Sequence, residues 1–197
     1  HDGNPLWTTL VEKKIQRLRE LATWEEDYAY FKRVSFIAED SGPLSSTSPH
    51  IKGSPALGER GAFESPLSAH EVNCKLVSGL CVYYRLTGCE PALDLAGAIV
   101  RGVLKHSRAF DDKGRWLMFH FHICTSSLLA IFEYAMVTKD AELVAFVDRC
   151  YQYGKALGEP LVGFFPELVP GFDRSALKPY QTYPDCETCD VADMIGL

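Results

Sequence analysis

The chain contains two similar helical hairpins, and this internal repeat constrains the fold more than any other feature. Each hairpin has a long apolar helix, a short turn that contains threonine and a second amphipathic helix, over residues 72–106 and 124–157. Thr87 in the first turn corresponds to Thr138 in the second, at a spacing of 51 residues. A single helix pair cannot bury its own apolar face, so such repeats stack against one another. The sequence therefore predicts a mostly α fold built from paired helices.

The remaining segments surround these hairpins. Residues 6–36 carry apolar side chains at helical spacing, which predicts a further helix. Residues 40–69 are rich in Gly, Pro and Ser, and residues 159–186 are rich in Pro, so we expect two long loops. A short final helix ends in apolar residues without a capping signal, so we expect the polypeptide to continue. Residues 1–197 are thus expected to form a single, incomplete domain, as part of a longer protein.

Charge and cysteine content exclude several classes of function. The 197 residues carry a formal net charge of −6, which argues against a nucleic-acid partner. No uninterrupted apolar run approaches the roughly 18 residues of a spanning helix, so we expect no membrane partner. The seven cysteines are odd in number and most lie in apolar helical patterns. We therefore expect reduced thiols and a reducing compartment such as the cytoplasm. Sequence patterns for a phosphate-binding loop or a serine nucleophile elbow are absent.

The segment Cys186-Glu187-Thr188-Cys189 at the start of the final helix carries the most distinctive group of reactive side chains. Zinc accepts thiolate and carboxylate ligands, so Glu187 and Cys189 are candidate metal ligands. A zinc site has about four ligands, so the others would come from elsewhere. Two cysteines at this spacing are also typical of redox dithiols, although those usually begin a helix after a strand. A third interpretation is an acidic helix start with two incidental cysteines, in which Glu187, Asp190 and Asp193 interact favourably with the helix dipole.

Further candidates for catalysis or substrate binding lie between the hairpins and after them. His120 and His122 precede the second hairpin, where they could bind sugar hydroxyls or a metal, or be structural. Glu167 follows Phe and Pro, and an apolar environment would raise its carboxyl pKa as a general acid requires. A solvated glutamate is the alternative. Trp116 could stack on a sugar ring or belong to the core.

The signature from Thr87-Gly88 to Leu93 and Ala96, together with Glu187-Thr188-Cys189, resembles the β-L-arabinofuranosidase family of glycoside hydrolases. The resemblance implies an (α/α)6 toroid of six helical hairpins, of which this chain would form a part. It also implies a zinc ion held by Glu187, Cys189 and two cysteines beyond Leu197. One of those later cysteines would act as the nucleophile.

The same resemblance implies a retaining hydrolase that acts on terminal, arabinofuranoside-like sugars. Glu167, which lies 20 residues before Glu187, would be the general acid and base. His120 or His122 would contact the carbohydrate substrate. Two alternatives remain: a noncatalytic α-toroid that binds a glycan or a protein, and a lyase or epimerase on a similar toroid. The former need hold no zinc, and the latter would be insensitive to chelation and to thiol alkylation.

Overall fold

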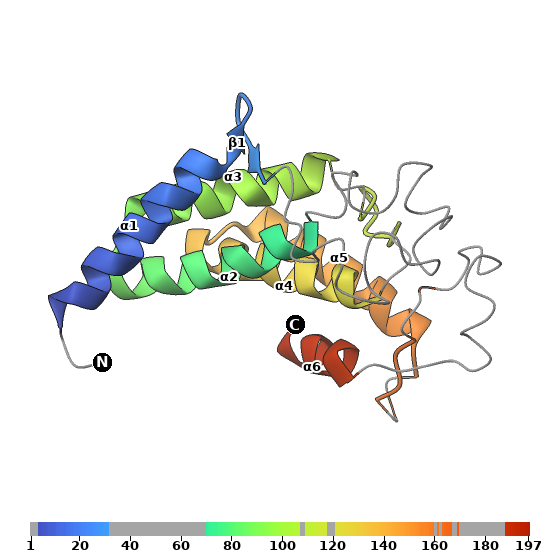
Figure 1. The fold of residues 1–197 in the computed structure, drawn as a ribbon. Helices are drawn as coiled ribbons and strands as arrows, with labels where there is room; N and C mark the ends of the chain where they lie inside the picture. Colours follow the sequence, from blue (N-terminus) through green and yellow to red (C-terminus); the bar gives the residue numbers. More distant parts are fainter. Residues whose placement is uncertain are drawn as a thin grey trace, which may run out of the picture.

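The structure is a computed structural model that describes residues 4–31, 70–106, 109–117, 121–159, 161, 163–166, 169 and 188–197. Within these ranges the chain forms six helices and one short antiparallel sheet (Figure 1). The helices are α1 (Pro5–Leu21), α2 (His70–Thr87), α3 (Glu90–His106), α4 (Phe121–Thr138), α5 (Ala141–Leu157) and α6 (Thr188–Gly196), and the strands are β1 (Thr23–Trp24) and β2 (Ala29–Tyr30). The prediction of a mostly α fold is confirmed.

Both predicted hairpins are present, and their turns repeat in detail. Thr87 ends α2 and Thr138 ends α4, and each hydroxyl donates to the carbonyl of the residue four positions earlier, at 2.7 and 2.9 Å. The next residues, Gly88 and Lys139, have φ angles of +70° and +57°. This left-handed conformation commonly ends a helix. The 51-residue spacing in the sequence therefore corresponds to a repeated backbone geometry.

The core lies between the two hairpins. The α2 helix packs on both α3 and α4, so the hairpins stack through their first helices (Figure 1). Fully buried apolar side chains come from all three of these helices: Val77, Cys81, Leu95, Ile99, Leu128 and Ile131. Each large aliphatic side chain removed from water in this way contributes about 1.5–3 kcal/mol to folding. Helix stacking thus supplies the apolar burial that a single hairpin lacks.

The α4 helix is the central and most apolar element. By length and composition, Phe121–Thr138 could cross a membrane. This helix was not detected as a candidate span from the sequence, because only uninterrupted apolar runs were considered. Half of this helix is buried inside the structure, and α2, α3, α5 and α6 all pack against it. Its apolar side chains fill the space between these neighbouring helices.

The N-terminal segment differs from the prediction of a helix over residues 6–36. The α1 helix ends at Leu21, and β1 then pairs antiparallel with β2, with Thr23 opposite Tyr30. Ala29 in β2 is fully buried, and β2 lies against α3. Aromatic and β-branched residues favour strands that pack on a half-buried surface. Contact with α3 therefore selects the strand pair over a longer helix. The loop predicted at residues 40–69 lies outside the described residues.

Candidate metal centre

An aromatic cluster fixes the start of α4. Phe121, where α4 begins, is fully buried, and its ring centroid lies 4.6 Å from that of Trp116 and 5.5 Å from that of Phe165. The indole Nε1 of Trp116 donates to the backbone carbonyl of Cys150 in α5 at 2.9 Å. Aromatic pairs at such distances stabilise a fixed arrangement beyond their burial. The next residue, His122, is thereby held at the end of the helix nearest α6.

Trp116 belongs to the core. Its side chain is only 3% exposed, and Gly154 in α5 lies directly against its ring. The hypothesis that Trp116 stacks on a sugar is therefore wrong, because a buried indole has no face available to a ligand. Its role is to support Phe121 and, through it, the position of His122.

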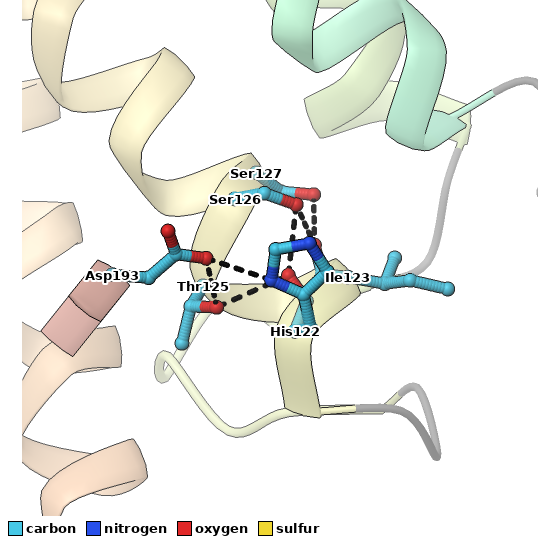
Figure 2. A network of polar contacts seen from close by, with 6 residues as sticks. All are labelled: His122, Ile123, Thr125, Ser126, Ser127 and Asp193. Carbon is cyan, nitrogen blue, oxygen red and sulfur yellow. Dashed lines mark hydrogen bonds and ion pairs between the residues drawn. The ribbon is translucent and has the colours of Figure 1, made fainter. Parts of the chain in front are cut away.

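Polar contacts join His122 to α6 (Figure 2). The imidazole Nδ1 lies 2.9 Å from Oδ2 of Asp193, and the Thr125 hydroxyl donates to the same carboxylate oxygen at 2.8 Å. The side chains of His122 and Asp193 are each only 18% exposed, so little water competes for these contacts. One carboxylate oxygen therefore holds two side chains from the first turn of α4.

Two serines continue the polar turn after Thr125. The Ser126 hydroxyl donates to the His122 carbonyl at 2.8 Å, and the Ser127 hydroxyl donates to the Ile123 carbonyl at 2.5 Å (Figure 2). Both side chains are buried, and buried hydroxyls in helices commonly bond to carbonyls one turn earlier. These two hydrogen bonds stay within α4. The Ser127 oxygen also accepts from the Cys74 thiol of α2 at 3.5 Å, and Thr125 reaches α6.

The first turn of α6 completes a group of three candidate metal ligands. A ring nitrogen of His122, the sulfur of Cys189 and a carboxylate oxygen of Asp190 all lie within 4.8 Å of one another. Asp190 is fully buried, and the other two residues are half-buried. No second group of this kind occurs in the part of the chain that the structure describes. Folding thus brings together ligands that are 67 residues apart in the sequence.

The donor atoms of this group fit zinc. Nitrogen, thiolate sulfur and carboxylate oxygen are all common zinc ligands, and catalytic sites typically use three protein ligands and one open position. With bonds of about 2.0–2.3 Å, tetrahedral zinc separates its ligand atoms by roughly 3.3–3.8 Å. Ligand atoms that lie up to 4.8 Å apart would have to approach one another for all three to bind the same ion. The structure therefore places three candidate metal ligands close together at the junction of α4 and α6.

The structure brings together two of the predicted site residues. Cys189, predicted as a metal ligand, lies beside His122, which the family resemblance had assigned to substrate contact. The other predicted site residues lie outside the described residues, and so does the second cysteine of the Cys-x-x-Cys segment: His120, Glu167, Cys186 and Glu187. Because their ligand atoms lie within 4.8 Å of each other, His122 and Cys189 are both candidate metal ligands.

Sequence reasoning gave Asp190 and Asp193 only an electrostatic role at the helix start. The spacing of these two residues relative to Cys189 was more informative. Asp193 follows Cys189 by four residues and Asp190 by three, which places all three on one face of a helix. The sequence did not show which part of the chain this helix face packs against. The structure shows that it packs against the first turn of α4.

The cysteines of the helical core differ from Cys189 in their surroundings. Cys81 and Cys150 are 0% exposed, and burial raises the pKa of the Cys81 thiol to about 11 and that of Cys150 to about 12. No disulfide joins the six cysteines of the described residues. Because the thiolate is the reactive form, these two protonated thiols are poor nucleophiles near neutral pH.

Alkylation tests this difference. At pH 8, below the raised pKa values of Cys81 and Cys150, iodoacetamide is expected to modify the half-buried Cys89 much faster than either of them in the native chain. In denaturant all three should react at similar rates, because unfolding removes the cause of the pKa shift. Peptide mass spectrometry measures each rate. Equal rates in the native chain would contradict the assignment of Cys81 and Cys150 as protonated core thiols.

Comparison with known proteins identifies no relative. No family model matches the chain, and no curated protein or solved structure matches it. The stacked hairpins and the group of His122, Cys189 and Asp190 are therefore the observations from which a function can be argued.

Proposed function

We propose that the protein is a zinc-dependent glycoside hydrolase with its metal site at the junction of α4 and α6. The observation that carries this proposal is the approach of ligand atoms from His122, Cys189 and Asp190 to within 4.8 Å of one another. Zinc sites combine these ligand types, and an open fourth position is typical of catalysis. The stacked α2–α3 and α4–α5 hairpins support a place for the chain in an (α/α)6 toroid.

The carbohydrate substrate in this proposal comes from the resemblance to the β-L-arabinofuranosidase family. Cys189 is a zinc ligand by that resemblance and also a member of the group that the fold assembles. Glu187, two residues earlier, remains a further candidate ligand. Because a zinc site has about four ligands, His122 and Asp190 would replace two of the ligands that the resemblance implies. The substrate class is a terminal, arabinofuranoside-like sugar.

The proposed chemistry divides between the metal and the chain. When bound, zinc would supply the positive charge that keeps a coordinating thiol deprotonated at neutral pH. Glu167 is the proposed general acid, which donates a proton to the departing glycosidic oxygen and later accepts one from water. His120 is the proposed substrate contact. The nucleophile that the resemblance implies is a cysteine outside residues 1–197, so turnover is proposed for the longer protein.

Chelation combined with one substitution tests the proposal. The full-length protein is expected to bind one zinc ion per chain and to hydrolyse a nitrophenyl arabinofuranoside. A chelator should abolish hydrolysis, and added zinc should restore it. Glu167→Gln should reduce turnover by about 10²- to 10⁴-fold, the usual contribution of general acid–base catalysis. The same variant should retain its zinc.

Other outcomes would identify the competing functions. Glycan binding without zinc and without hydrolysis would contradict the proposal and favour a noncatalytic binding module. Sugar conversion that resists both chelation and thiol alkylation would favour a lyase or an epimerase. Hydrolysis that depends on zinc but is unchanged in Glu167→Gln would reject Glu167 as the acid while leaving the reaction class intact.

A further inference from the structure

We infer that Asp193 is the positioning residue of the metal site and that it directs His122 to bind the metal through Nε2, an inference that rests on the proposed function. The starting observation is the 2.9 Å contact between Nδ1 of His122 and Oδ2 of Asp193. Histidine ligands in metal sites commonly donate their second ring N–H to a carboxylate, which fixes the tautomer and the orientation of the ring.

The chemistry of the two groups determines which nitrogen faces the metal. Oδ2 of Asp193 accepts from the Thr125 hydroxyl, and with this oxygen as an acceptor the 2.9 Å contact assigns the hydrogen to Nδ1 of His122. In a neutral imidazole with Nδ1 protonated, the lone pair that can bind a metal is on Nε2. The carboxylate also increases the basicity of the ring and so strengthens the bond that Nε2 makes.

Asp193 supports the site without being one of its three ligands. It contacts His122 but does not belong to the group whose ligand atoms lie within 4.8 Å of one another. The Thr125 hydroxyl donates to the same carboxylate oxygen at 2.8 Å, which restricts the rotation of the carboxylate (Figure 2). Two contacts from α4 therefore hold Asp193 in the orientation that its contact with His122 requires.

The position of Asp193 in α6 couples it to the two ligands from the same helix. It lies one turn after Cys189 and Asp190, and the adjacent Met194 is buried whereas Ile195 is 81% exposed. The burial of Met194 sets which face of α6 meets α4. That face presents the two α6 ligands and the carboxylate that orients His122. The orientation of α6 about its own axis therefore positions all three groups.

Zinc affinity tests the role of Asp193. In the full chain, titrated with zinc in competition with a chromophoric chelator, Asp193→Ala is expected to weaken binding by about 10- to 100-fold, as for other residues that orient metal ligands. Asp193→Asn retains an acceptor oxygen and should lose less. Thr125→Val should weaken binding in the same direction but by a smaller factor. Ser126→Ala is the matched control, because the hydroxyl of Ser126 donates to the backbone carbonyls of His122 and Ile123 and not to Asp193.

Nitrogen NMR of the histidine rings separates positioning from a structural role. On zinc binding, the Nε2 resonance of His122 should shift strongly while Nδ1 keeps its hydrogen, with His122→Gln used to assign the signals. Unfolding of the zinc-free variants measures any structural cost independently. Wild-type affinity in Asp193→Ala, or binding of zinc through Nδ1, would overturn this inference alone. Failure of the wild-type chain to bind zinc would overturn both the inference and the proposed metal site.

Discussion

Cys189→Ala is expected to reduce zinc affinity by more than the roughly 10- to 100-fold that is typical of residues outside the ligand set. The substitution removes the thiolate, the strongest zinc ligand among the three side chains that gather at the start of α6. The remaining imidazole and carboxylate form an incomplete site. We therefore expect no stoichiometric zinc in the purified variant and no increase in its melting temperature when zinc is added.

Competition titration and calorimetry measure both effects. Zinc that binds only the folded state at 100 times its dissociation constant stabilises wild type by about 2.7 kcal/mol, and Cys189→Ala should lose this increment. Cys89→Ala is the matched control, because Cys89 is also half-buried but lies in the turn between α2 and α3. Equal zinc binding in wild type and Cys189→Ala would exclude the thiol as a ligand.

Gly154→Ala is expected to lower the free energy of unfolding by about 1–3 kcal/mol, the usual cost of overpacking a core. A β-carbon at position 154 would lie 2.2 and 2.5 Å from two ring carbons of Trp116, well inside van der Waals contact. The indole cannot move aside easily, because Nε1 bonds to the carbonyl of Cys150 and the ring lies against Phe121. The strain should therefore reach the start of α4.

A second glycine provides the control for this experiment. Gly79 is exposed in α2, and a β-carbon there would meet no atom within 4 Å. Gly79→Ala should consequently stabilise the chain by about 0.4–1 kcal/mol, because alanine restricts the unfolded chain and favours the helix. Urea unfolding measures both variants. A similar change in both would show that Trp116 does not limit the space beside Gly154.

Local sequence patterns were sufficient to predict the helical hairpins. The spacing of Thr87 and Thr138 indicated equivalent turns, and the structure confirms them through equivalent hydrogen bonds and left-handed residues at positions 88 and 139. Such features depend on residues within one turn of each other. The strand pair after α1 was not predicted, because the contact of Ala29 with α3 joins segments far apart in the sequence.

The candidate site was predictable only in part for the same reason. The chemistry of Cys189 was evident from the residue and its neighbours, and the ligand potential of His122 was evident from its imidazole. Their approach depends on the packing of α6 on α4, which no pattern within either segment specifies. Asp190 was missed because an acidic residue in a first helical turn has an ordinary explanation in the helix dipole.

The small size of α6 links the occupancy of the site to the order of this segment. A nine-residue helix is marginal in water by itself, so its persistence depends on what attaches it to α4. An ion shared by His122, Cys189 and Asp190 would act as a crosslink between the two helices. In the proposed site, the metal would add to the contacts of Met194 and Asp193 that attach α6 to α4, so its removal would loosen α6 before the rest of the helices.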